Sequence, residues 1–423
     1  METQEKSPAK QIVRAPSQAL AVRSAALVAR GLRDLARDSN WLIKKVFTGR
    51  SPQLVISPTG ELCALSPLVR QGAERIALYD IERGVPTLAL VVPGEPDMCP
   101  PGLPAAFAWS PTARHLVAAW GGWLPELHVF DLHGKVFLGG FGDFKSFPSF
   151  VSWSDTGRYF AAASRGGGEA RLRLWPASGQ SLAAMPFSAE PAAELAAPSA
   201  GENWLETQTV DAESGDEGSF SGFGRVAFSP DESTLACAVE MEGEWADDLI
   251  VLLDVPSLRK QRTIPAQGRV TDIAWTPDSR QLIYCSAGQA YRLAAGAVAQ
   301  DAERLRSLGG RSFSSDMTPA SPSGVLTPEA SALTSPATWG AEPLPFGAEL
   351  CAVHPHLPLC LFFSSWLKNS AKGRLFLVDL NRMVVFDEYA AEGVVNLRWS
   401  LDGSKAYAVT ADGLAYIYEP PLL

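Results

Sequence analysis

A short phrase that recurs along the chain constrains its fold more than any other feature. Each copy has alternating apolar residues, then Ser, Thr or His, then usually Pro with a polar residue, then a second apolar run. The period of two indicates strands, and Pro beside Asp, Thr or Gly supplies a tight reversal, so each copy is predicted to be a β-hairpin. The seven copies are LVISPTGELCAL (54–65), FAWSPTARHLVAA (107–119), VSWSDTGRYFAAA (151–163), VAFSPDESTLACA (226–238), IAWTPDSRQLIYC (273–285), CAVHPHLPLCLFF (351–363) and LRWSLDGSKAYAV (397–409).

The spacing of the copies sets the size of the repeating unit. The aligned turn residues are 53, 44, 75, 47, 78 and 46 positions apart, and they are Ser57, Ser110, Ser154, Ser229, Thr276, His354 and Ser400. A unit of about 45 residues fits a four-stranded propeller blade, and each long interval then holds one insertion. Third strands also tend to end in an apolar residue followed by an acid, as in Tyr79-Asp80, Phe130-Asp131, Leu253-Asp254, Val378-Asp379 and Tyr418-Glu419.

These phrases, with strand endings such as RLRLWPASG (171–179) and RLFLVDL (374–380), resemble those of WD-repeat β-propellers over roughly residues 41–423. The resemblance implies an all-β, seven-bladed propeller. The Gly-His pair and the literal Trp-Asp of that family are absent, so its His-Asp-Ser-Trp side-chain network is not carried over to any blade. A TolB-like or peptidase-type propeller, which shares the turn phrase, is the alternative architecture.

The two ends of the chain suggest how the ring closes. The seventh unit stops at Tyr418-Glu419-Pro420 with three strands, and a strand-like run, WLIKKVFTG (41–49), precedes the first unit. Adding that run to the last blade would remove two exposed edges. We therefore expect a propeller over 41–423, closed by its N-terminal strand and preceded by a basic arm and helix over 1–40.

The N-terminal arm has the pattern of an amphipathic helix. Residues 1–50 hold ten Lys/Arg and four Asp/Glu, and Ser17 is a candidate N-cap. Arg23, Arg30 and Arg37 lie seven apart, which places them on one polar stripe of a helix in which leucines also recur at helical spacing. Two interpretations are open: a helix that packs on the domain or on a partner through these arginines, and an organellar targeting segment. The helical pattern continues past Asp34 without a cleavage signal, which favours the first.

Composition limits the class of partner. The net charge is -10, and the basic residues are concentrated in the N-terminal arm, so a nucleic-acid partner is disfavoured. No apolar run approaches the roughly 18 residues of a membrane span, and a membrane surface is the weaker option for the arm. The scattered cysteines suit a reducing compartment, so we expect the cytoplasm or nucleus, with organellar import through the arm left open; they are Cys63, Cys99, Cys237, Cys285, Cys351 and Cys360.

Two insertions interrupt the rhythm of the blades. The first, around 189–222, holds eight acids and no base, and the second, around 309–346, is rich in Ser, Thr and Pro. Acidic and proline-directed contexts make five residues candidate phosphorylation sites, although a solvated loop without regulation is the favoured interpretation. The five candidates are Ser214, Thr318, Ser321, Thr327 and Ser335.

Signatures of catalysis are missing from the sequence. It has no phosphate-binding Gly-rich loop, no paired-His zinc helix and no nucleophile elbow. Cys351, His354, His356 and Cys360 lie close in sequence, but their positions in the sixth repeat favour packing over a metal site. Trp109, Trp153, Trp275 and Trp399 occupy equivalent strand positions and are predicted to be core. Trp120 and Trp123 are the better candidates for an exposed partner contact, although packing is again the favoured role.

We therefore expect a non-enzymatic protein-interaction scaffold or adaptor subunit, without cofactor or metal and with other proteins as partners. The alternative is an enzyme or ligand-binding propeller whose site lies in the central channel. Charged groups along that channel would favour the alternative, and an apolar or plugged channel would favour the scaffold.

Overall fold

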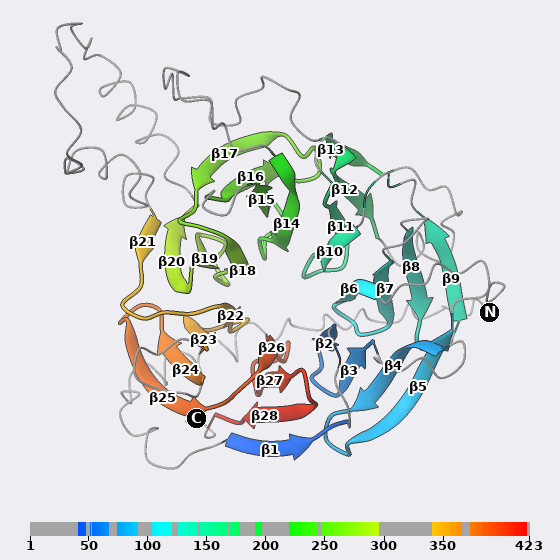
Figure 1. The fold of residues 1–423 in the computed structure, drawn as a ribbon, viewed down its shortest axis with the longest axis vertical. Coiled ribbons are helices and arrows are strands. Elements are labelled where there is room, and N and C mark those ends of the chain that lie inside the picture. Colours follow the sequence, from blue (N-terminus) through cyan, green and yellow to red (C-terminus); the bar gives the residue numbers. More distant parts are fainter. Residues whose placement is uncertain are drawn as a thin grey trace, which may run out of the picture.

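The computed structural model of the chain consists of seven antiparallel sheets of four strands each, built from the residues that it describes. Figure 1 shows these sheets following one another around a common axis, which confirms the expected seven-bladed all-β propeller. None of the described residues belongs to a helix long and apolar enough to cross a membrane. The described residues are 41–47, 51, 53–66, 74–91, 104–120, 126–134, 136–141, 144, 146, 148–166, 169–177, 191–196, 220–242, 247–295, 341–365 and 373–420.

Each blade runs from an inner strand near the axis to an outer strand at the rim (Figure 1). Blades 1 and 2 consist of β2 (Leu54–Ile56), β3 (Leu62–Leu65), β4 (Glu74–Asp80) and β5 (Val85–Val91), then β6 (Pro104–Trp109), β7 (His115–Trp120), β8 (Glu126–Asp131) and β9 (Val136–Phe141). Blades 3 and 4 consist of β10 (Pro148–Trp153), β11 (Tyr159–Ser164), β12 (Arg171–Pro176) and β13 (Ala193–Ala196), then β14 (Phe220–Phe228), β15 (Thr234–Met241), β16 (Leu249–Asp254) and β17 (Lys260–Pro265).

Blades 5 and 6 follow the same order around the ring. They consist of β18 (Val270–Trp275), β19 (Gln281–Ser286), β20 (Gln289–Ala294) and β21 (Ala341–Pro343), then β22 (Leu350–Val353), β23 (Leu359–Ser364), β24 (Arg374–Asp379) and β25 (Val384–Ala390). Blade 7 consists of β26 (Val394–Trp399), β27 (Ala406–Thr410), β28 (Leu414–Tyr418) and, as its outer strand, β1 (Trp41–Lys45).

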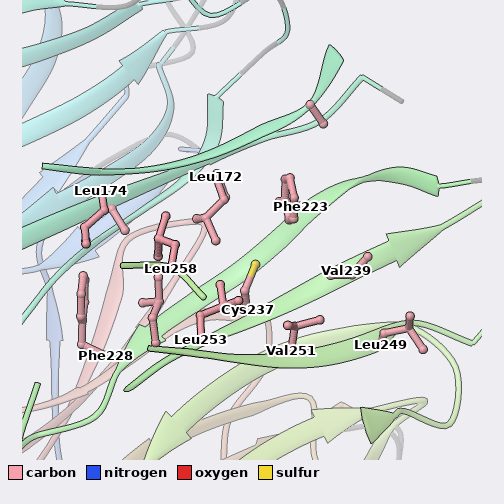
Figure 2. Packing of buried hydrophobic residues seen from close by; sticks show 14 residues of the cluster. Leu172, Leu174, Phe223, Phe228, Cys237, Val239, Leu249, Val251, Leu253 and Leu258 are labelled. Carbon is pink, nitrogen blue, oxygen red and sulfur yellow. The ribbon is translucent and has the colours of Figure 1, made fainter. Parts of the chain in front are cut away.

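The hydrophobic core lies between neighbouring blades. Second strands such as β7 and β23 are buried along their whole length, because both faces are covered, and their sequences are correspondingly continuous apolar runs. Figure 2 shows one interface, where Leu172 and Leu174 of blade 3 pack with Phe223 and Cys237 of blade 4. Burying a side chain of the size of leucine contributes about 1.5–3 kcal/mol, so each interface couples two blades strongly.

The outer strand of blade 7 comes from the N-terminal end of the described chain. β1 pairs antiparallel with β28, with Trp41 opposite Tyr418 and Lys45 opposite Leu414. The Trp41 ring lies 5.0 Å from the ring of Tyr418 and 5.7 Å from that of Tyr389 in blade 6. Val46 and Phe47, directly after β1, are buried. This strand therefore has both a sheet partner and a packed side-chain face.

The two ranges predicted as insertions each include residues that belong to strands of the blades. The range 189–222 contains β13, whose Leu195 pairs with Leu172, and its last residues begin β14. The range 309–346 contains β21, in which Ala341 is buried and pairs with Leu293. These outer strands are short and lie in Ala- and Pro-rich sequence, so they have no clear apolar/polar alternation by which to predict them. They form because the third strand of the blade has a free edge with which they can pair.

Most of the predicted contact and modification sites lie outside the described residues. These sites are Arg23, Arg30, Arg37, Trp123, Ser214, Thr318, Ser321, Thr327 and Ser335.

Candidate functional site

A polar channel along the propeller axis is a concave feature of the described structure. Two cavities, of about 610 and 340 Å³, are lined by the inner strands and their turns. They share eight lining residues, so they are adjoining parts of one central channel: Ser152, Trp153, Asp155, Arg225, Val395, Asn396, Arg398 and Leu401. The larger cavity is within the range of small-molecule sites.

Three arginines line the larger cavity, against a single carboxylate, Asp155. Arg398 comes from β26 and Arg225 from β14, and neither forms an ion pair with any carboxylate that the structure describes. Arg165, which follows β11, instead pairs with Glu240, which does not line the cavity. The channel is therefore charged, as expected for the ligand-binding alternative.

The two unpaired guanidinium groups are held by only a few contacts. Arg225 Nε donates to the carbonyl oxygen of Thr271 at 3.0 Å, and its guanidinium lies 5.3 Å from the centroid of the Phe150 ring. Arg398 donates to the carbonyl oxygen of Ile56 at 3.4 Å. A guanidinium has five N–H donors, so most of the donors of both groups remain free for a ligand.

Burial in the channel shifts the pKa values of its charged groups. Desolvation lowers the pKa of Arg398 to about 10, and the negative charge of Asp155 opposes that shift. For the carboxylates, desolvation raises the pKa of Asp155 and of Asp272. The positive charge of Arg398 opposes the shift of Asp155, and that of Arg225 opposes the shift of Asp272. Arg225, Arg398 and Asp272 are half-buried, so their charged forms are incompletely solvated and interact more strongly with an incoming charge, whereas Asp155 is exposed.

The turn phrase forms a repeated hydrogen-bonded device at one end of the inner strands. In six blades the side-chain oxygen of the turn residue accepts the N–H five positions later, at 2.9 to 3.1 Å, as between Ser110 and His115. The residue three positions after the Ser or Thr has a positive φ in all six: Gly60, Ala113, Gly157, Glu232, Ser279 and Gly403. The hydroxyl thus fixes the reversal that joins the first two strands of a blade.

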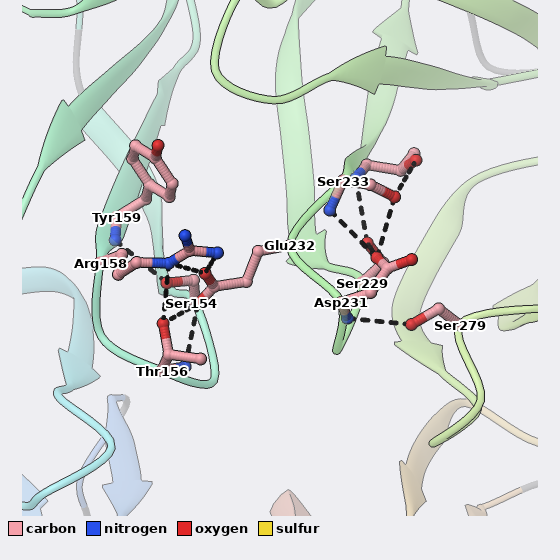
Figure 3. A network of polar contacts seen from close by, with 10 residues as sticks. Ser154, Thr156, Arg158, Tyr159, Ser229, Asp231, Glu232, Ser233 and Ser279 are labelled. Atoms are coloured by element: carbon pink, nitrogen blue, oxygen red, sulfur yellow. Dashed lines mark hydrogen bonds and ion pairs between the residues drawn. The ribbon is translucent and has the colours of Figure 1, made fainter.

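Neighbouring turns contact one another around the channel. Figure 3 shows Glu232 of blade 4 reaching the turn of blade 3, where it accepts from the N–H of Thr156 at 2.9 Å and pairs with Arg158 at 2.5 Å. The N–H of Asp231 donates to Ser279 Oγ of blade 5 at 3.0 Å. These contacts join the turns of blades 3, 4 and 5 at this end of the ring.

The aligned tryptophans are buried, as expected, and they also connect blades. Each indole N–H donates across a blade boundary to a backbone carbonyl of the preceding inner strand, at 3.0 to 3.2 Å. The pairs are Trp109 to Val55, Trp153 to Ala108, Trp275 to Ala227 and Trp399 to Ala352. The spacing of the turn phrases predicted the positions of these tryptophans, but their hydrogen bonds to the preceding blade become visible only in the folded ring.

The Cys/His cluster of blade 6 takes part in backbone hydrogen bonds and in core packing. His354 Nδ1 accepts the N–H groups of His356 and Leu357, both at 3.0 Å, so its Nε2 carries the proton and donates to the carbonyl oxygen of Gly403 at 3.1 Å. Cys351 and Cys360 are buried in the apolar core between blades 5 and 6. No group of three or more potential metal ligands is found among the described residues.

Trp120, a candidate exposed contact in the sequence analysis, is buried. It is the last residue of β7, not part of a loop, and only 3% of its surface is exposed. Its ring stacks on His128 with centroids 4.8 Å apart. The packing interpretation is therefore correct, because the apolar run of β7 continues through this residue.

The acids that end the third strands act in the next turn. Asp80 accepts the N–H of Arg83 at 2.8 Å, and Asp379 accepts that of Asn381 at 2.8 Å. Asp131 accepts the N–H of His133 at 3.0 Å and also pairs with Arg114. The aligned acid is therefore a turn-forming residue in these blades, not a catalytic one.

Comparison with known proteins supports the fold. No protein-family model matches the chain, and no curated protein matches its sequence. Among solved structures, the β-propeller domain of Cps50 (Swd1) from Myceliophteria thermophila is 11% identical, with 89% of this chain and 99% of that one covered and a TM-score of 0.54. A chain of the mitotic checkpoint complex is 13% identical, with 90% and 94% covered and a TM-score of 0.54. A chain of hydrazine synthase from Kuenenia stuttgartiensis is 14% identical, with 88% and 96% covered and a TM-score of 0.56.

These identities are too low to carry a function from any of the three. The fold itself is clear: this chain is a β-propeller protein with seven blades.

Proposed function

We propose that this chain is a divergent WD-repeat propeller that serves as a non-enzymatic protein-interaction subunit, in the cytoplasm or nucleus. The observation that carries the proposal is the rigid ring of blades, whose turns are fixed by the Ser/Thr device and linked by contacts such as Glu232 with Thr156. A rigid scaffold holds exposed loops in place for recognition.

Isolation of the native complex tests this proposal. A tagged chain expressed at its natural level is crosslinked in cells, purified and sized by gel filtration. We expect it to elute well above its own mass of 45.3 kDa with one or more partners in fixed ratio. Elution as a free monomer, with no protein crosslinked to it in fixed ratio, would contradict the proposal.

A ligand-binding propeller is the second candidate, and the charged channel favours it. Arg225 and Arg398 line both parts of the channel without a carboxylate partner among the described residues. Half-buried charges without an ion pair cost folding free energy, so they are expected where a ligand supplies the missing charge. A thermal-shift screen of small anions and cations on the purified chain tests this candidate. Stabilisation by none of them would count against it.

Phosphorylation of the two insertions belongs to the interaction proposal. Phosphates at Ser214, Thr318, Ser321, Thr327 or Ser335 would add charge and acceptors for a basic partner. Mass spectrometry of the native protein tests for them.

A further inference from the structure

We propose that the central channel binds a ligand through a phosphate group, which Arg225 and Arg398 hold from blades 4 and 7. This inference rests on the ligand-binding candidate above and names its chemical class.

The balance of charge in the channel is opposite to that of the whole protein. The chain carries a net charge of -10, yet the two parts of the channel together have three arginines and two carboxylates, Asp155 and Asp272, on their walls. The pairing of Arg165 with Glu240 leaves Arg225 and Arg398 as the two channel arginines that form no ion pair with a described carboxylate, although Asp155 and Asp272 lie on the same channel walls. A narrow passage with low-dielectric walls focuses such a field and attracts anions into it.

Two carboxylates share the channel with these arginines, and neither forms an ion pair with them. Both oxygens of Asp272 accept backbone N–H groups, from Ile273 at 3.1 Å and from Cys351 at 3.0 Å. Asp155 lies in the turn after β10 and shares the cavity with Arg398, but the two do not form an ion pair. Asp155 is thus available to accept a hydroxyl or amine hydrogen from the uncharged part of a ligand.

The number of free donors favours phosphate over carboxylate. A phosphate ester presents three charged oxygens in three directions, so two guanidinium groups on different walls can bind it together. One carboxylate is satisfied by a single bidentate arginine. Arg225 is also oriented for this role, because its Nε is held by Thr271 and its flat face rests on Phe150.

The size of the cavity allows two sources for the phosphate. A volume of about 610 Å³ accommodates a nucleotide or sugar phosphate, and equally a phosphorylated side chain that enters from a partner. The shared chemistry is a phosphate monoester with a neighbouring hydroxyl or amine, and the test separates the two sources.

Calorimetric titration of the full chain tests the proposal. The probes are glucose 6-phosphate, adenosine monophosphate and an acetylated Gly-phosphoserine-Gly peptide, each beside its unphosphorylated form, with citrate as a carboxylate probe. We expect saturable binding of at least one phosphate probe and none of its unphosphorylated form. Arg225→Gln and Arg398→Gln should each weaken binding by roughly tenfold, as for the loss of one charge-assisted pair.

The control variant is Arg83→Gln with Arg382→Gln, which removes two arginines that pair with turn acids in blades 1 and 6, away from the channel. It should bind as the wild type does, and thermal melts should show that all variants remain folded. The proposal is overturned if no phosphate probe binds or if the Arg225/Arg398 double variant binds equally well. Binding of citrate alone would overturn the phosphate class and leave the ligand-binding candidate standing. The peptide and the two metabolites distinguish a partner's phosphate from a free one.

Discussion

At the turn of blade 6, His354 occupies the place that a hydroxyl residue holds in the other blades. It is buried, and both ring nitrogens are engaged with backbone groups, so only the neutral ring fits without rearrangement. Burial lowers its pKa from the ordinary 6.5 to about 4; the carbonyl of Gly403 opposes this shift. In the interval between these values the unfolded chain binds a proton that the native chain does not.

His354→Ser should therefore change how stability depends on pH. The favourable contribution of the neutral histidine is complete above pH 6.5 and is lost as the pH falls towards 4. We expect the wild type to lose roughly 2 kcal/mol relative to the variant between pH 7 and pH 4.5. Urea unfolding of both proteins measures this, and other titrating groups cancel in the difference. Parallel pH profiles would contradict the prediction.

Two residues with left-handed backbone give a matched pair of glycine substitutions. Ala113 has φ of 55° and Glu232 has φ of 58°, at the turn position where blades 1, 3 and 7 have glycine. Ala113→Gly relieves the strain and removes only a half-buried methyl group that packs against the core between blades 1 and 2, so it should raise stability by about 0.5 kcal/mol. Glu232→Gly relieves the same strain but removes the contacts with Thr156 and Arg158, so it should cost about 1–3 kcal/mol. Unfolding free energies that change in the same direction would refute the role of Glu232 as a link between blades.

At the scale of elements, β1 is the strand whose position is most informative. Its residues pair with β28, Trp41 packs on Tyr418, and Lys44 Nζ donates to the carbonyl oxygen of Glu82 in blade 1 at 3.1 Å. β1 thus contacts both the last blade and the first blade of the ring. Its loss would expose the edge of β28 and separate these contacts.

Truncation measures the contribution of β1. Removal of residues 1–50 should lower the melting temperature far more than removal of residues 1–15, because only the first deletes the strand. Trp41→Ala is a subtler version and should cost about 3 kcal/mol, since the indole is 9% exposed. Equal melting temperatures for the two truncated chains would show that the strand is dispensable.

The strand pattern also shows what sequence could predict at this scale. Inner and second strands were located because they are apolar, periodic and bounded by the turn phrase. The outer strands β13 and β21 were missed, because they have three or four residues and weak patterns. Their place is decided by the free edge of the preceding strand, which is a tertiary property.

At the scale of the whole molecule, charge is divided between a basic arm and an acidic body. Residues 1–50 carry a surplus of six positive charges, whereas the whole chain carries -10. Glu substitution of Arg23, Arg30 and Arg37 reverses the proposed polar stripe. We expect this variant to lose partners recruited through the arm while its melting temperature stays unchanged, since the propeller core is untouched.

Crosslinking of wild type and variant at two salt concentrations checks this prediction. Exposed ion pairs are individually weak and screened, so recruitment should also decline as salt rises. A variant with three exposed arginines of the propeller changed to Glu, namely Arg83, Arg259 and Arg280, is the charge-matched control. The same partners on both variants would show that the stripe takes no part in recruitment.

The sequence by itself determined the repeating unit, the number of blades and the positions of the turn residues. These features are encoded locally, because a period of two and a Ser/Thr-Pro turn specify a hairpin wherever they occur. The indole bonds between blades, the link from Glu232 to Thr156 and the unpaired arginines of the channel were decided only by the tertiary structure. Each joins residues from different blades, such as Arg225 and Arg398, which lie 173 positions apart in the chain and line one cavity only when the ring has formed.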